Sequence, residues 1–217
     1  MKMKKNYSDL TLVLDRSGSM SSIAEETISG FNEFIDNQKR LPVEATFSLV
    51  QFDDTYELVH DGIPIQDVPL LDNHTFVPRG CTALLDAIGK TIDDVGKRLA
   101  SLDEEQRPDK VVVVIITDGQ ENSSTQYNLS DINKKISHQR NAYKWEFLFL
   151  GANQDAIATA VNVGIRSSSA LTYAATPEGT TSAFRSSSRS VGLFTEGGSE
   201  FAEFDASDLQ DLDNPEQ

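Results

Sequence analysis

Four short runs of apolar residues, separated by polar stretches, predict the buried strands of a β-sheet. The run at 111–116 (VVVVII) is β-branched throughout and does not alternate with polar residues, as expected for a strand covered on both faces. Asp53-Asp54 predicts a turn, after which residues 56–59 return as an antiparallel edge strand, and a short edge strand is expected over 170–174. The four apolar runs cover residues 10–14, 45–52, 111–116 and 146–150.

Between these runs, apolar residues recur every three or four positions, which is the spacing of an amphipathic helix. Ser130 is the expected N-cap of the third helix. Thr176-Pro177-Glu178 places a proline at the first position of the last helix, where its missing N–H costs nothing. The recurring apolar positions of the five predicted helices span residues 24–35, 85–99, 132–136, 156–161 and 184–194.

The alternation of strands and helices predicts an α/β fold: a doubly wound, mostly parallel central sheet with one antiparallel edge strand and helices on both faces. Residues 61–80 contain three prolines and no clear period, so we expect a long loop there. We expect three parts along the chain. Residues 1–7 form a short basic extension, residues 8–195 one folded domain, and residues 196–217 a flexible acidic tail.

The composition is that of a globular protein. Of 217 residues, 38% are hydrophobic and 24% are charged, and no apolar run approaches the ~20 residues of a membrane span. The basic N-terminus precedes an apolar stretch that is shorter than the ~7–15 residues of a signal-peptide core. The single cysteine, Cys81, forms no intrachain disulfide and is expected to be a small buried loop residue. We therefore expect a cytoplasmic protein with no membrane contact.

The negative charge argues against nucleic acid as a partner. The formal net charge is −15, and such a chain repels a phosphate backbone. The charge is unevenly placed, because residues 196–217 hold eight acids and no bases while the first 195 residues hold 26 acids and 19 bases. About half of the excess therefore lies in the tail.

Two of the predicted strands end in an aspartate. Asp15 follows the first apolar run and Asp118 follows the run at 111–116, 103 residues further along. Ligands of open α/β sheets bind outside the carboxyl ends of the strands, so both carboxylates are expected at one crevice. Side by side they would repel each other, and a bound divalent cation is the simplest way to keep both ionised.

Hydroxyl groups accompany both acids. Ser17 and Ser19 lie two and four positions after Asp15, and Thr82 precedes the second predicted helix. Carboxylates, hydroxyls and water are hard oxygen ligands, which suit Mg²⁺, Mn²⁺ or Ca²⁺ better than softer metals.

The set Asp15-x-Ser17-x-Ser19, Thr82 and Asp118-Gly119 resembles the metal-ion-dependent adhesion site (MIDAS) of von Willebrand factor type A (VWA) domains. All five positions are occupied in the expected order, and the similarity covers roughly residues 8 to 195. The resemblance implies a Rossmann-like sheet with strand order 3-2-1-4-5-6. It also implies that Ser17, Ser19 and Thr82 are hydroxyl ligands, and that Asp15 and Asp118 hold the ion directly or through water.

The resemblance further implies a binding module that is not an enzyme. The cation, most simply Mg²⁺, keeps an open position for an Asp or Glu side chain of a protein partner. Some stand-alone intracellular members of this family are accessory subunits beside AAA+ ATPases, and others belong to stress or tellurite-resistance complexes.

Several alternatives stay open from the sequence. A metal-assisted phosphoester hydrolase could use Asp15 and Asp118 as metal ligands, although no histidine or lysine accompanies the motif as a base. Glu121 and Asn122 are either supports of the site or part of a solvated loop. A carboxylate of the tail at 196–217 is a further possible ligand of the metal, its simpler interpretation being a solvating end.

Overall fold

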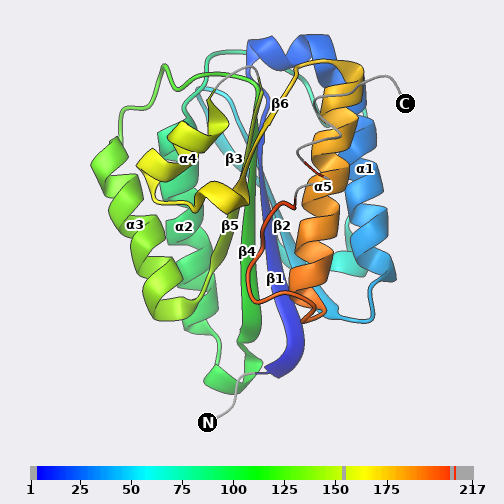
Figure 1. Cartoon of the computed structure of the whole chain (residues 1–217), viewed down its shortest axis with the longest axis vertical. Helices are drawn as coiled ribbons and strands as arrows, with labels where there is room; N and C mark the ends of the chain where they lie inside the picture. The colour runs from blue at the N-terminus through cyan, green and yellow to red at the C-terminus, as the bar shows by residue number, and fades with distance from the viewer. Residues whose placement is uncertain (1–3, 153–154, 206–207, 209–217) are drawn as a thin grey trace.

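The computed structural model describes residues 4–152, 155–205 and 208, and it contains one six-stranded sheet (Figure 1). The strand order is β3-β2-β1-β4-β5-β6, and every neighbouring pair is parallel except β2 with β3. This confirms the predicted doubly wound sheet with one antiparallel edge strand. The strands are β1 (Lys4–Asp15), β2 (Glu44–Phe52), β3 (Tyr56–Pro64), β4 (Pro108–Thr117), β5 (Glu146–Ala152) and β6 (Ala170–Tyr173).

Helices cover both faces of the sheet, with α1 and α5 on one side and α2, α3 and α4 on the other (Figure 1). Within the described ranges, no helix is both long and apolar enough to cross a bilayer. The helices are α1 (Ala24–Arg40), α2 (Leu84–Ser101), α3 (Leu129–Tyr143), α4 (Ala156–Val163) and α5 (Pro177–Thr195).

The central strand β1 explains why the apolar runs do not alternate. Leu12 and Leu14 pack into the core beneath α1 and α5, whereas Val13 packs into the core beneath α2 and α3. All three side chains are fully buried, because helices cover both sides. Leu14 pairs with Ile116 of β4 and Asp15 with Phe52 of β2, so these three strands end together at one edge of the sheet.

The helix ends follow the sequence signals with one correction. Thr176 caps α5 by accepting the Gly179 N–H at 3.1 Å, with Pro177 next to it as predicted. The N-cap of α3 is Asn128, not Ser130. Asn128 and Asp131 accept each other's backbone N–H groups, which satisfies two free donors where Ser130 would satisfy one.

The predicted long loop over 61–80 is shorter and better packed than expected. Strand β3 continues to Pro64, and a 3₁₀ turn covers Ile65–Asp67. Three apolar side chains of the remaining loop are buried in the core beneath α1: Val68, Leu71 and Phe76. A proline at the end of an edge strand breaks no ladder bond, which is why the strand can extend this far.

The described part of the tail also differs from the expectation of flexibility. Ala202 is buried, the Phe204 N–H donates to the Ser168 carbonyl at 2.9 Å, and the Arg166 guanidinium lies 4.0 Å from the centre of the Phe201 ring. Residues 196–205 therefore pack onto the domain. The remainder of the predicted tail, apart from Asp208, lies outside the described residues.

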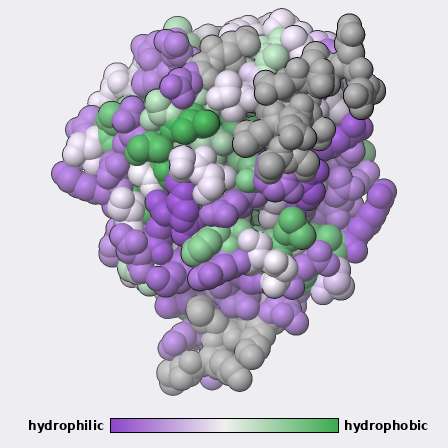
Figure 2. Space-filling model, in the orientation of Figure 1, coloured by the Kyte–Doolittle hydropathy of each residue, from purple (hydrophilic) through white to green (hydrophobic). Residues whose placement is uncertain are grey.

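The surface in the view of Figure 1 is largely hydrophilic, in line with the net charge (Figure 2). A hydrophobic patch lies over α4, where Ile157 and Val161 are exposed. Single exposed apolar residues of this kind are common on protein surfaces and need no partner.

Candidate metal centre

Asp15 is a buried acid at the carboxyl edge of the sheet. It ends β1 and has no exposed surface. One carboxylate oxygen, Oδ1, accepts the Ser17 N–H at 2.6 Å, and Oδ2 accepts the Thr117 hydroxyl at 2.6 Å. Burial raises the pKa of Asp15 to about 6, because these hydrogen bonds only partly offset the desolvation and the Asp118 charge raises the pKa slightly further.

Asp118 is connected to Asp15 by a chain of hydroxyl groups. Its Oδ1 accepts the Ser19 hydroxyl at 2.6 Å, and the Oγ atoms of Ser17 and Ser19 lie 3.1 Å apart. Desolvation raises the pKa of Asp118 above its usual value. The first loop of the motif and the end of β4 thus meet, although 99 residues separate Ser19 from Asp118.

Thr82 reaches the same place from a third segment, and Gly119 shows how close it lies. A Cβ atom added to Gly119 would stand 2.6 Å from Thr82 Oγ1 and 3.5 Å from Asp15 Oδ2. The space beside Gly119 is therefore bordered by both oxygens, and any larger residue would fill it. With Thr82, the structure brings all five predicted residues together.

Asn122 holds Thr82 in position. Its Oδ1 accepts the Thr82 N–H at 2.9 Å, and its own N–H donates to the Thr82 carbonyl at 3.1 Å. Glu121 instead accepts the Leu85 N–H at 2.9 Å, which fixes the start of α2. The sequence left these two residues as either supports of the site or part of a solvated loop. Asn122 supports the site directly, and Glu121 supports it indirectly through α2.

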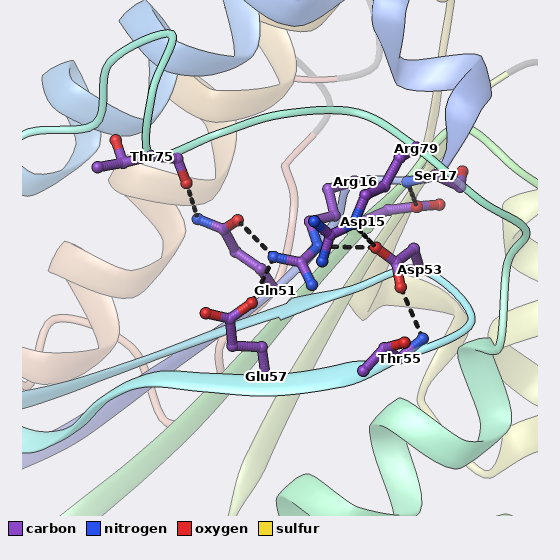
Figure 3. Close-up of polar contacts among 9 residues, drawn as sticks. All are labelled: Asp15, Arg16, Ser17, Gln51, Asp53, Thr55, Glu57, Thr75 and Arg79. Carbon is purple, nitrogen blue, oxygen red and sulfur yellow. Dashed lines mark hydrogen bonds and ion pairs between the residues drawn. The ribbon is translucent and has the colours of Figure 1, made fainter.

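A network of charged residues beneath the motif was not predicted (Figure 3). The Arg16 Nε and the Arg79 Nε both donate to Asp53 Oδ2, at 3.0 and 2.9 Å, and Arg16 Nη1 donates to Glu57 at 2.6 Å. Burial acts to raise the pKa of Asp53, but the Thr55 N–H and the two guanidinium groups outweigh it and hold the pKa below its usual value. Asp53 directly follows β2 as Asp118 directly follows β4, and this position was the available sequence signal.

The network joins the loop after β1 to the loop that carries Thr82. The Arg79 N–H donates to the Arg16 carbonyl at 2.7 Å, and the Gly18 N–H donates to the Gly80 carbonyl at 3.2 Å. Gly80 adopts φ +68°, and a Cβ there would stand 2.5 Å from Asp54 Oδ1, so glycine is required at this contact. The spacing between the two loops is thus fixed by backbone as well as side chains.

Cys81 is exposed, which corrects the expectation of a buried residue. The chain turns inward directly after it, since its neighbour Thr82 is 3% exposed. The remaining unpredicted contact is Thr117, whose hydroxyl donates to Asp15. A threonine at the end of a β-branched run has no feature that separates it from a core residue.

The donor set fits a divalent cation that prefers oxygen. Two carboxylates and three hydroxyls are hard ligands, and a cation between two acids whose pKa values are raised by desolvation would stabilise their ionised forms. In the part of the chain that the structure describes, no three His, Cys, Asp or Glu side chains are placed so that they could hold a metal ion by themselves. Hydroxyl groups therefore have to complete this site.

Comparison of the sequence with models of known protein families gives a match. A family model described as the von Willebrand factor type A domain matches residues 9–191. No curated protein matches the sequence.

Several solved structures share the fold. Proximal thread matrix protein 1 from the mussel byssus has 16% identity and a TM-score of 0.59, over 89% of this chain and 47% of that one, and another structure of it has a zinc-occupied MIDAS motif. A variant of the PilB minor pilin from Streptococcus sanguinis has 11% identity and a TM-score of 0.59, over 92% and 64%. The vWF domain of the type V pili tip protein Mfa5 from Porphyromonas gingivalis has 10% identity and a TM-score of 0.56, over 90% and 97%.

The TM-scores establish a shared fold, and at identities of 10–16% the likeness extends to the fold alone. The chain spans about half the length of the mussel protein.

Proposed function

Because the chain belongs to the von Willebrand factor type A family of protein-interaction modules, we propose that it binds a protein partner through a divalent cation held at the candidate metal centre. The partner contributes an Asp or Glu carboxylate to the open position of the ion. The observation that carries this proposal is the convergence of four oxygen-bearing side chains, those of Ser17, Ser19, Thr82 and Asp118, on the buried Asp15.

Each residue has a part in this proposal. Ser17, Ser19 and Thr82 offer neutral hydroxyl oxygens, while Asp15 and Asp118 supply the negative charge, directly or through water. When bound, the cation supplies an electrophile that is only partly neutralised by its ligands, so an incoming carboxylate gains a charge-assisted bond. Mg²⁺ is the ion we propose, with Mn²⁺ and Ca²⁺ compatible with the same donors.

A binding role is favoured over catalysis by the surroundings of the two acids. In the described residues, their hydrogen-bond partners are hydroxyl and backbone N–H groups, with no histidine or lysine among them. Nothing in that set can act as a general base at neutral pH. We propose that the chain is a cytoplasmic accessory subunit; the unpaired Cys81 is in line with the reducing compartment that this location implies.

Calorimetric titration with Mg²⁺ tests the metal site, and partner capture in Mg²⁺ or EDTA tests the binding role. We expect one Mg²⁺ per chain, lost in Asp15→Ala and Thr82→Ala and kept in Asp36→Ala, which removes an exposed acid of α1. We expect a partner that is retained in Mg²⁺ and released by EDTA. Equal metal binding by the wild type and Asp15→Ala, or capture that EDTA leaves unchanged, would contradict the proposal.

A further inference from the structure

The loops around the candidate metal centre are acidic, with a single exposed cation among their described residues. Segments 15–23, 53–55, 75–83 and 118–128 hold five acids and two arginines, Arg16 and Arg79. Arg16 is 6% exposed, and Asp53, Gln51 and Glu57 accept its N–H groups. The Arg79 side chain is 59% exposed.

Arg79 is exposed but held in place (Figure 3). Its Nε donates to Asp53 Oδ2 at 2.9 Å, and its backbone N–H donates to the Arg16 carbonyl at 2.7 Å. Its two Nη groups have no hydrogen-bond partner in the described part of the chain. The outer edge of the guanidinium is therefore available, while the side chain has already lost much of its rotational freedom.

Asp53 accepts hydrogen bonds from two guanidinium groups, and only that of Arg79 reaches the surface. Asp53 is 1% exposed, and the buried Arg16 already pairs with the same oxygen at 3.0 Å. The Thr55 N–H donates to the other oxygen at 2.6 Å. Because Arg16 also pairs with Glu57 at 2.6 Å, the second guanidinium balances the remaining negative charge of this network, and its exposed edge presents that positive charge at the surface.

Arg79 also lies on the loop that carries one of the candidate ligands. Thr82 is three residues further along, and the intervening Gly80 is bonded to Gly18 of the motif loop at 3.2 Å. This arrangement places a fixed guanidinium at the border of the site. Its planar edge suits a carboxylate, which can accept two parallel hydrogen bonds.

Resting on the proposed function, we propose that Arg79 binds a second carboxylate of the partner beside the one captured by the cation. The domain then selects a pair of acidic groups in preference to a single one. The acidic loops repel a lone carboxylate approaching away from the cation, and Arg79 is the exposed point where a second negative charge is favoured.

Binding of small carboxylates to the Mn²⁺-loaded protein tests this inference. Displacement of water from Mn²⁺ is followed by water-proton relaxation, during titration with acetate and with the α,ω-dicarboxylates from succinate to pimelate. For each dicarboxylate, we compare its affinity with that of acetate for the same protein. For at least one of them, we expect this ratio to be about five times larger in the wild type than in Arg79→Gln, which is the upper range for an exposed ion pair. Acetate affinity should be the same in both proteins.

Two further variants separate recognition from structural effects. Arg185→Gln removes an exposed arginine of α5 that pairs with Glu33, and it should keep the preference. Arg79→Lys keeps the charge but loses the planar edge, and it should keep acetate binding with a reduced preference. Equal preferences in the wild type and Arg79→Gln would overturn the inference, as would a parallel loss of acetate binding. Failure to bind Mn²⁺ or acetate in the wild type would instead refute the proposed function, and the inference with it.

Discussion

Replacing Asp15 with asparagine should make the metal-free protein more stable at neutral pH. Asp15 is fully buried, and its pKa of about 6 lies well above the ordinary 3.8. Keeping this carboxylate ionised in the folded state therefore costs free energy. The asparagine side chain has nearly the same shape and no charge, so it removes that cost.

The pKa difference sets the magnitude. Each pKa unit corresponds to 1.36 kcal/mol, so a rise from 3.8 to about 6 costs about 3 kcal/mol when both states are ionised. Below pH ~4 both states are protonated and there is no cost. Between pH ~4 and ~6 only the unfolded state loses its proton, so the free energy of unfolding of the wild type falls, and the full cost is present above pH ~6.

The hydrogen bonds of Asp15 are compatible with the substitution. The amide oxygen can still accept the Ser17 N–H. The Thr117 hydroxyl, which lies 3.1 Å from the Gly119 carbonyl, can donate there and accept from the new amide.

Urea unfolding in EDTA at pH 4 and pH 7.5 measures the effect. We expect the free energy of unfolding of Asp15→Asn to exceed that of the wild type by up to about 3 kcal/mol at pH 7.5 and by less than about 1 kcal/mol at pH 4, while Asp36→Asn changes neither value. An Asp15→Asn protein that is less stable than the wild type at pH 7.5 without metal would refute the reasoning.

Gly119→Ala should weaken Mg²⁺ binding at least tenfold, because the added Cβ would stand 2.6 Å from Thr82 Oγ1. An unchanged affinity in calorimetry would contradict this prediction. Gly96→Ala in α2, whose Cβ would meet nothing within 4 Å, should leave binding intact and raise the free energy of unfolding by about 0.5–1 kcal/mol. Asn122→Ala, which removes the acceptor of the Thr82 N–H, should lower Mg²⁺ affinity about 10- to 100-fold in the same titration. Mg²⁺ at about 100 times its Kd should add about 2.7 kcal/mol to the free energy of unfolding of the wild type, and EDTA should reverse this; a melt insensitive to Mg²⁺ would count against the site.

Much of the fold was predictable because burial on both faces leaves a strong pattern. The unbroken run at 111–116 corresponds to the middle of β4, and the aspartates that end two such runs mark the sheet edge where ligands bind. Element boundaries were less certain, as the extension of β3 to Pro64 shows. The hydrophobic pattern is weaker in an edge strand, because fewer of its side chains are buried. The end of such a strand is set by its pairing with its one neighbour.

The contacts that support the site were less predictable. Arg79 and Asp53 are 26 residues apart, and no local pattern links an exposed loop arginine to a buried acid. The orientation of Cys81 depends on the turn at Gly80, which composition does not encode. The tail was predicted to be flexible from its acidic composition, which gave no sign that Ala202 is buried in the core.

Crystals grown with Mn²⁺ would test the central claim most directly, through the anomalous scattering of the ion. The account predicts one strong peak among Asp15, Ser17, Ser19, Thr82 and Asp118, and no such peak in Asp15→Ala crystals. A wild-type map without a peak at these residues, or with Mn²⁺ bound only elsewhere on the molecule, would contradict it.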